Sequence, residues 1–323
     1  MLKKSSEIDL ISRVCWLYYK QNMTQSQIGK KLNISRIKVL NLLKQAREEG
    51  IVHINIVTPL YNCLSLEQKL ISTFRLKDAM VVPTPNGQDE AIRESLGKAT
   101  AQYLEHYLKS GSLFAVGWGT SIVETVKFIS PNEIKNVRVV TLLGGLTPAF
   151  SLNPYDVGNK FASIVGGDCY YVHAPAITAS AEICESFKSD ITVKQALEMA
   201  YQADYVMGGI GVAGERSILV KMRYINLSET EALRHQGAVG EILAQFYNLQ
   251  GGKVDCNLHK RIVAFPIEDL SKMENVIGLA GGKAKVKAIL GAIRGGFIKT
   301  LITDEETAKL LLEKQKELSQ DGI

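Results

Sequence analysis

The segment FAVGWGTSIVETVKFI (114–129) contains residue types that could bind a phosphate group. Its apolar first residues are typical of a buried strand, its glycines of a tight loop, and its last residues of a helix. A glycine loop that enters a helix points backbone N–H groups and the positive end of the helix dipole at one place. Thr120 and Ser121 add hydroxyl donors there, so the segment predicts an anion site.

Composition limits the class of protein to which such a site belongs. Of the 323 residues, 46% are apolar and 22% charged, as is usual for a soluble chain with one large and one smaller domain. No apolar run approaches the roughly 18–20 residues that span a bilayer. The start, MLKKSSEIDL, carries acidic residues and no h-region, so we expect no signal peptide. The five cysteines lack CxxC spacing, and no histidine lies at metal-ligand spacing from cysteine or carboxylates. We therefore expect a cytoplasmic protein without a metal or other cofactor.

The positive charge is confined to the beginning of the chain. Residues 1–58 contain 10 Lys and Arg against 4 Asp and Glu, whereas the other residues contain 28 against 29. A basic patch limited to one small domain is typical of nucleic-acid binding. A solvated run of surface charge is the alternative, and the local pattern has to decide between the two.

That basic region has the pattern of a winged helix-turn-helix domain. A first helix, EIDLISRVCWLYYKQN, precedes Thr24 as the N-cap of QSQIGKKL and Ser35 as the N-cap of SRIKVLNLLKQAREE. Gly29 permits the close approach of two helices, and Asn33 tolerates the left-handed conformation of a turn. IVHINIV (51–57) alternates like a strand and is expected to form the wing.

The second helix of this motif separates apolar from polar positions. Val39, Leu42, Leu43 and Ala46 recur at the spacing of a buried stripe. The polar residues are left outward, and the N-terminal half of such a helix enters the major groove of DNA. A generic three-helix bundle shares the periodicity but not the segregation of charge. The residues predicted to bind DNA are Thr24, Gln25, Ser35, Arg36, Lys38, Asn41 and Lys44.

Residues 59–76 form a connecting segment of their own. LYNCLSLEQKLISTF has helical spacing, with leucines available for packing. Such a helix either couples the DNA-binding domain (1–58) to the rest of the chain or contributes to a dimer seam, and the sequence leaves both open.

Residues 77–323 have the pattern of a Rossmann-like, mostly parallel α/β domain. Short apolar runs alternate with longer amphipathic stretches, and nearly all of the runs end in Gly, Pro or Asp. The runs are AMVVP, LFAVG, VRVVTLLGG, CYYVHAP, ADYVMGGIG, VIGLAGG and TLITD. Because ligands bind outside the carboxyl ends of such strands, their glycine turns are candidates for one pocket. The turns are GWGTS (117–121), GG (144–145, with Gly145), GIG (209–211) and AGG (280–282).

A dinucleotide fingerprint is the competing interpretation of one of these turns. Gly209, Gly211 and Gly214 satisfy GxGxxG directly after a predicted strand. The following residues, ERSILVKMRYINLS, do not open a clean helix, and no acidic strand end follows at the expected place. A Rossmann cofactor site is therefore not favoured.

The order of motifs resembles that of the SorC-type transcriptional regulators, the sugar-binding branch of the DeoR regulators. The matching stretches are LYYKQNMTQSQIGKKLNIS, AREEGIVHI, FAVGWGTS, TLLGG, YYVHAPAI, GGIG, GAVGEILAQFYN, GLAGGKAKVKAILGAIRGGFI and LITDEETAKLLL. They cover nearly the whole chain. The resemblance implies a winged helix-turn-helix and an effector domain similar to sugar-phosphate isomerases. It further implies a homo-oligomer, typically a tetramer, that binds operator DNA near catabolic genes and responds to a phosphorylated sugar.

The resemblance also implies where the effector binds. Glu241 is the acidic residue of GAVG-[DE], and as an acceptor it would suit sugar hydroxyls, whereas Lys285 of AGGxxK would supply a point charge for phosphate. The effector residues implied by the resemblance are Trp118, Gly119, Thr120, Ser121, Glu241 and Lys285, and Gly145 joins the predicted set as part of the glycine turn at 144–145. One departure concerns the recognition helix, where Leu40 and Asn41 replace the Ser and Arg of the family pattern SR-x-x-VSRLL. The operator sequences of other family members therefore do not predict the operator of this protein.

Two classes of function stay open. The first is a ligand-responsive transcription factor, which is not an enzyme and has no catalytic residues. The second is an active sugar-phosphate isomerase or deaminase with an accessory DNA-binding domain. Enolisation requires a positioned base and an acid partner, and no paired carboxylates or Asp–His arrangement in residues 77–323 suits that task. The regulator is the favoured prediction.

Overall fold

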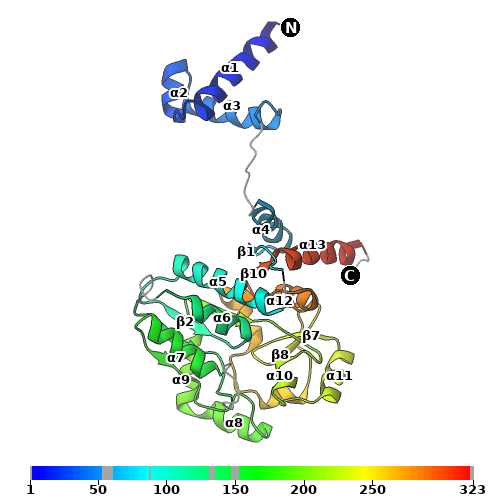
Figure 1. Ribbon diagram of the computed structural model, residues 1–323. Coiled ribbons are helices and arrows are strands. Elements are labelled where there is room, and N and C mark those ends of the chain that lie inside the picture. The colour runs from blue at the N-terminus through cyan, green and yellow to red at the C-terminus, as the bar shows by residue number, and fades with distance from the viewer. Residues whose placement is uncertain (1, 53–60, 87–88, 131–134, 147–152, 321–323) are drawn as a thin grey trace. The chain divides into compact units, whose positions relative to one another are not determined.

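The computed structural model describes residues 2–52, 61–86, 89–130, 135–146 and 153–320 (Figure 1). The chain divides into two compact units, Met1–Pro59 and Leu60–Ile323. Most of the segment expected to form the wing, from residue 53 onward, lies outside the described residues. Within the described ranges, no helix is long and apolar enough to cross a membrane.

The first unit contains the three helices of the predicted motif, α1 (Leu2–Tyr19), α2 (Gln25–Leu32) and α3 (Arg36–Glu48). Apolar side chains from all three helices form one core. Its buried members are Ile11, Val14, Cys15, Leu17, Ile28, Val39, Leu42, Leu43 and Ala46. The predicted stripe of α3 therefore faces this core, and the helix-turn-helix is confirmed.

Local interactions begin and end these helices where the sequence indicates. Thr24 and Gln27 form a capping box at the start of α2, and the Ser35 hydroxyl accepts the Lys38 N–H at 3.1 Å at the start of α3. Asn33 ends α2 in the left-handed conformation, with a φ of 53°. The turn between α2 and α3 is thus specified by residues that lie within it.

The second unit is built on a seven-stranded sheet with the order β1-β10-β9-β5-β2-β3-β4. All of its strand pairs are parallel, and each of the seven predicted runs contributes one strand. The strands are β1 (Asp78–Val82), β2 (Leu113–Val116), β3 (Arg138–Thr141), β4 (Cys169–Tyr170), β5 (Tyr205–Gly209), β9 (Val276–Leu279) and β10 (Thr300–Asp304). The predicted parallel α/β domain is confirmed.

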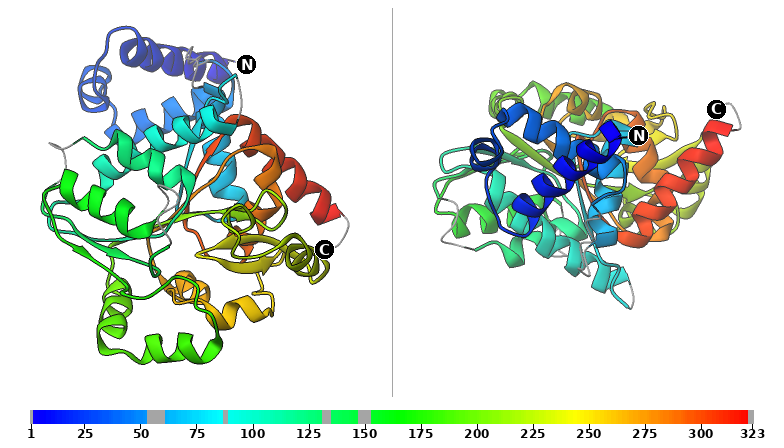
Figure 2. Two further views of the ribbon diagram at one scale, coloured as in Figure 1. Left: turned by 60° about the horizontal axis from the view of Figure 1, so that its bottom comes forward. Right: turned by 90° about the horizontal axis from the view of Figure 1, so that it is seen from above.

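Helices cover both faces of this sheet. Along β2, Phe114 and Val116 pack with α5, α6 and α7, whereas Leu113 and Ala115 belong to the core on the opposite side, which includes side chains of α4, α12 and α13. Figure 2 shows α13 beside α4 and α12, against which it packs. The helices are α4 (Tyr61–Phe74), α5 (Asp89–Tyr107), α6 (Thr120–Phe128), α7 (Pro154–Ile164), α8 (Ala181–Ser189), α9 (Ile191–Ala200), α12 (Val286–Arg294) and α13 (Glu305–Gln320). The connecting helix α4 therefore packs as part of the second unit.

A second, three-stranded antiparallel sheet lies between β5 and β9 in the chain and was not predicted. It has the order β6 (Gly211–Val212), β7 (Ala238–Ile242), β8 (Gln245–Asn248). Two short helices, α10 (Ile218–Lys221) and α11 (Leu227–His235), connect β6 to β7. Because the last glycine of GIG begins β6 and the next helix is the four-residue α10, the GxGxxG glycines do not open a Rossmann helix.

Candidate functional site

A cavity of about 170 Å³ lies at the carboxyl ends of β2, β5 and β9. Six of the seven predicted effector residues line it, from segments more than 160 residues apart in the chain. The lining residues that carry polar or charged side chains are Asp89, Arg93, Thr120, Ser121, Arg216, Lys221, Glu241 and Lys285, together with the Trp118 indole. The strand order explains the convergence, because β2, β5 and β9 are direct neighbours in the sheet.

Gly145 is the predicted residue that the structure does not bring to this cavity. Its N–H donates to the Ala174 carbonyl at 2.8 Å, and an added Cβ would lie 2.7 Å from the Tyr155 ring. The turn after β3 therefore needs a glycine for packing against Tyr155. This packing explains why the motif TLLGG ends in glycine, and no contact with an effector is needed to explain it.

The first turn of α6 forms one wall of the cavity. Gly119 precedes the helix with a φ of 138°, a conformation open to glycine and strained for other residues. The first N–H groups of a helix have no partner within it, and the helix dipole makes this end positive. Thr120 and Ser121 lie at this end and line the cavity. The helix start therefore faces the cavity, and the anion site expected from GWGTS stays a prediction.

Glu241 enters the cavity from β7 and is 3% exposed. Its Oε2 accepts the Ala244 N–H at 2.9 Å across the turn between β7 and β8. Gly211 of β6 lies opposite Glu241, and an added Cβ there would be 2.0 Å from Oε1. Burial raises the pKa of Glu241 to about 7, although the Ala244 N–H and the charge of Lys285 oppose this rise. The carboxylate is thus held away from water with few donors to stabilise its charge.

The turn beside Glu241 has an uncommon backbone conformation. Leu243 and Ala244 have φ values of 53° and 64°, and Ile242 pairs with Gln245 across them. Both residues are therefore in the left-handed region, as in the tightest hairpin turns, where Asn and Gly are usual. Strain of this kind clusters at functional sites, and here the turn directs the Ala244 N–H at the carboxylate.

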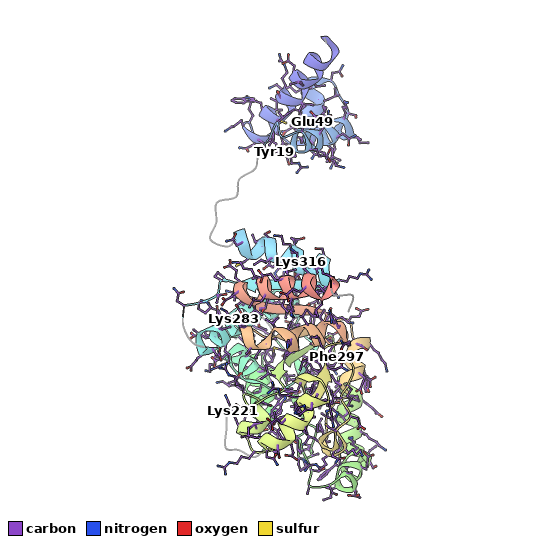
Figure 3. All side chains as sticks on the ribbon, turned by 90° about the vertical axis from the view of Figure 1, so that its right-hand side faces the viewer. Tyr19, Glu49, Lys221, Lys283, Phe297 and Lys316 are labelled. Carbon is purple, nitrogen blue, oxygen red and sulfur yellow. The ribbon has the colours of Figure 1, made fainter. Side chains whose placement is uncertain are left out.

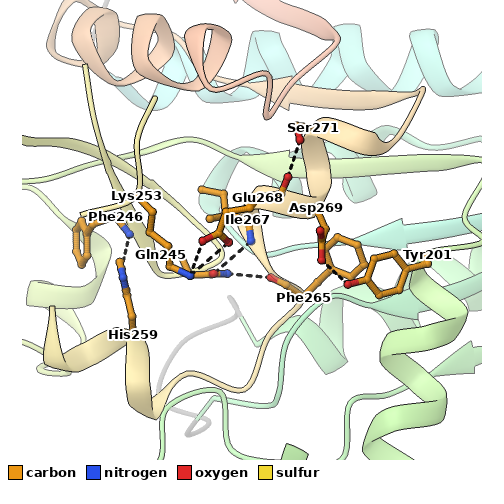
Figure 4. Close-up of polar contacts among 10 residues, drawn as sticks. All are labelled: Tyr201, Gln245, Phe246, Lys253, His259, Phe265, Ile267, Glu268, Asp269 and Ser271. Atoms are coloured by element: carbon orange, nitrogen blue, oxygen red, sulfur yellow. Dashed lines mark hydrogen bonds and ion pairs between the residues drawn. The ribbon is translucent and has the colours of Figure 1, made fainter. Parts of the chain in front are cut away.

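Side-chain contacts on β8 fix this hairpin to the rest of the unit (Figure 4). Gln245 Nε2 donates to the Phe265 carbonyl at 2.8 Å, and its Oε1 accepts the Ile267 N–H at 3.2 Å. The Phe246 N–H donates to His259 Nε2 at 2.7 Å. Burial lowers the pKa of His259 to about 4, so the imidazole is neutral and can accept this hydrogen bond near pH 7. His259 is thereby a structural residue.

Lys285 approaches the cavity from the turn after β9. Burial lowers its pKa to about 8, with the nearby Arg93 adding to this effect and Glu241 opposing it. The turn is held by the buried Asp304 and by Thr307, which both accept the Gly282 N–H, at 3.0 and 2.7 Å. This support was not predicted, although an Asp at the end of TLITD with a Thr three residues later is a capping signal.

Three further cations line the cavity and were missed from the sequence. Arg93 of α5, Arg216 and Lys221 join Lys285, so four cations face the two carboxylates Asp89 and Glu241. Among the described residues, none of these four cations forms an ion pair or a side-chain hydrogen bond. No motif marks the three, because only the fold brings them to the glycine loops. The cavity carries an excess of uncompensated positive charge.

Lys283 provides a contrast two residues before Lys285. It forms an ion pair with Glu306 at 2.8 Å on the surface, and Figure 3 shows it among the outward side chains of the second unit. Its charge is therefore already compensated. The two lysines of the AGGKAK turn differ in both burial and partner.

The predicted DNA-binding residues lie at the start of α2 and along α3. Arg36, Lys38, Asn41 and Lys44 are exposed on α3, and Lys44 lies 3.7 Å from Glu48. Thr24, Gln25 and Arg36 share a surface hollow with Tyr18 and Tyr19. The hydroxyl oxygens of Thr24 and Ser35 accept backbone N–H groups as helix caps. These two residues thus position the helices, whatever else they contact.

Potential catalytic and metal-binding groups are few in the described part of the chain. It contains no cluster of three or more His, Cys, Asp or Glu that could hold a metal ion. The lining of the cavity includes Asp89 and Glu241 as its acidic residues, and no described histidine or cysteine.

Comparison with known proteins defines the class. A family model described as "Putative sugar-binding domain" matches residues 58–313. The transcriptional regulator LsrR of Enterobacter sp. is 33% identical over 311 residues, 95% of this chain and 94% of the relative. The erythritol catabolism regulatory protein EryD of Brucella abortus is 31% identical, over 94% and 96%. The crystal structure of the full-length sorbitol operon regulator SorC from Klebsiella pneumoniae superposes with a TM-score of 0.74 at 29% identity, over 94% of this chain and 98% of that one.

These similarities and the two described units define a transcriptional regulator with a sugar-binding domain. The chain belongs to the SorC family of such regulators, as the order of its motifs predicts.

Proposed function

We propose that this protein binds operator DNA of a carbohydrate catabolic operon through α3, and that a phosphorylated sugar in the cavity controls this binding. The main support for this proposal is the lining of one cavity. It contains the N-terminus of α6 and four cations that have no ion-pair partner among the described residues. A dianionic phosphate is the group that this combination favours most. The names of EryD and SorC support a sugar-related operon.

The cavity suggests separate roles for its two ends. Thr120, Ser121 and Lys285 bind the phosphate through N–H, hydroxyl and ammonium donors. Glu241 accepts hydrogen bonds from sugar hydroxyls, for which an acceptor-only group is suited. An unphosphorylated sugar leaves the cations uncompensated and is expected to be a poor effector.

Lys285 and Lys283, two residues apart in the same turn, allow a matched test of this proposal. Purified wild-type protein, Lys285→Ala and Lys283→Ala are titrated with a panel of sugar phosphates and the corresponding free sugars while binding to a DNA duplex is measured. The duplex is one that the wild-type protein selects from a random-sequence pool. Lys285→Ala should bind this DNA like the wild type without effector but lose the response to sugar phosphate, whereas Lys283→Ala should keep it. A normal response in Lys285→Ala would exclude the proposed phosphate site.

The isomerase or deaminase alternative is favoured by one observation, the pKa of about 7 at Glu241. A carboxylate with this pKa would suit a general base at neutral pH. The same sugar-phosphate panel, assayed for conversion by wild type and Glu241→Gln, distinguishes the two. We expect no turnover, and turnover abolished by Glu241→Gln would establish an enzyme.

We further propose that the protein acts as a homo-oligomer, at least a dimer and more specifically a tetramer. Operators of helix-turn-helix proteins are read by two-fold-related recognition helices, and one short helix makes few phosphate contacts. Sedimentation with and without the selected duplex tests this, and a monomer at micromolar concentration on DNA would contradict it. Such a role places the protein in the cytoplasm with the DNA.

A further inference from the structure

The exposed face of α3 carries two large apolar side chains that are not needed for packing of the helix against its core. Ile37 is 70% exposed, the largest fraction among the large apolar side chains of the described residues, and Leu40 is 50% exposed. Neither belongs to the core of the first unit. Single exposed apolar residues are common on protein surfaces, so the position of these two on the helix is what matters.

Helix geometry places both residues on one stripe. Ile37, Leu40, Asn41 and Lys44 follow the spacing i, i+3, i+4, i+7, as the buried stripe of Val39, Leu42, Leu43 and Ala46 does. The two stripes are offset by two residues, which is about 200° around the helix axis. Ile37 therefore lies at the middle of the face opposite the core, near the N-terminal end of the helix.

The surroundings of Ile37 indicate what covers it. Arg36 and Lys38 flank it in the sequence and Lys44 lies on the same stripe, and all three are exposed. A cationic rim around an apolar centre complements a surface with an anionic rim and an apolar floor. The major groove has this character at A·T pairs, because phosphates border it and the thymine C5-methyl is the apolar group on its floor.

We propose that Ile37, with Leu40 beside it, contacts thymine methyl groups in the operator and makes the protein select thymine there. This inference rests on the proposed binding of DNA by α3. It assigns sequence reading to apolar contact as well as to Asn41, whereas Arg36, Lys38 and Lys44 supply affinity that does not depend on sequence. A protein partner on the same face is the competing occupant.

The test removes one methyl group at a time. Full-length wild-type protein first selects duplexes from a random-sequence pool, and each selected thymine is then replaced by deoxyuridine, which lacks only the methyl. At one or two positions in each half-site, this replacement should weaken binding about fourfold per methyl, as the transfer of one such group from water implies. Ile37→Ala should bind the thymine duplex more weakly and show no further loss with deoxyuridine. Ile37→Val should keep most of the sensitivity.

Ile191→Ala is the matched control, because Ile191 is 64% exposed but lies on α9 of the second unit. It should bind both duplexes like the wild type. Circular dichroism confirms that each variant is folded, and all three substitutions are at the surface. Equal sensitivity to deoxyuridine in wild type and Ile37→Ala would overturn the inference. So would unchanged DNA binding by Ile37→Ala together with an altered oligomeric state, which would assign this face to a protein contact. Failure of the wild type to select any duplex would instead reject DNA binding itself.

Discussion

At the scale of single residues, the surroundings of Glu241 and Lys285 disfavour the charged form of each side chain. Burial raises the pKa of the carboxyl to about 7 and lowers that of the ammonium to about 8. Each shift means that the folded unit disfavours the charged form relative to water. A ligand with hydroxyl donors for Glu241 and a phosphate for Lys285 would stabilise both charged forms. The site thus sacrifices some stability for binding, as functional sites commonly do.

Glu241→Gln should raise stability in a pH-dependent way. Because its folded pKa lies above the ordinary value of 4.5, the contribution of Glu241 is fully present below about pH 4.5 and is lost as pH rises through 7. Glutamine keeps an acceptor for the Ala244 N–H without the charge. We expect the variant to gain about 3 kcal/mol over the wild type at pH 8, where the loss is nearly complete, and less than about 1 kcal/mol at pH 5. Thermal unfolding of the full chain at both pH values measures this, and an equal change at the two would contradict it.

At the scale of elements, the site depends on how closely β6 approaches β7. The glycine opposite Glu241 leaves the space that the carboxylate occupies, and the turn of Leu243 and Ala244 supplies its hydrogen bond. The N-terminus of α6 and the turn after β9 form the other walls. The effector response should therefore be sensitive to backbone spacing in β6 as well as to the charged groups.

Gly211→Ala should abolish the response to sugar phosphate. The added Cβ would lie 2.0 Å from Glu241 Oε1, so the carboxylate must move. Gly214→Ala, three residues later, is the control because an added Cβ there meets no atom within 4 Å. The measurement is DNA binding across an effector titration. A normal response in Gly211→Ala, or its loss in Gly214→Ala, would show that Glu241 is not positioned in this way.

At the scale of the whole molecule, the proposed function requires that the effector cavity and the DNA-binding unit be energetically coupled. An effector changes operator affinity only if it binds two arrangements of the protein with different affinities. A coupling of about 1–3 kcal/mol would change operator affinity about 5–150-fold. The positive charge of residues 1–58 would supply the part of that affinity that depends on salt.

Neutralising Arg36 and Lys38 together should weaken DNA binding and flatten its dependence on salt. Each lost phosphate contact should reduce the slope of log affinity against log salt concentration by about 0.9. Asn41→Ala should instead change the preferred sequence and leave the slope nearly unchanged. Affinity measured at several salt concentrations distinguishes these effects. An unchanged slope in the double variant would remove α3 from the DNA interface.

The sequence by itself determined the elements whose pattern is local. Strands such as Leu113–Val116 are covered on both faces and are therefore continuous apolar runs. Helix α3 shows its core stripe at a period of 3.6 residues and its cap at Ser35. The start of α6, where an anion site is predicted, could be recognised because a strand, a glycine loop and a helix follow one another in the chain.

Only the tertiary structure decided what depends on neighbours distant in the chain. The strands β6–β8 were missed because the turn between β7 and β8, Leu243–Ala244, lacks the Gly or Asn that usually marks a hairpin. Gly145 was placed in the cavity by analogy with the other glycine turns, but packing against Tyr155 is what requires it. Arg93 and Lys221 converge on the glycine loops although no pattern marks them. Sheet order and side-chain burial set these positions, and both are properties of the folded chain as a whole.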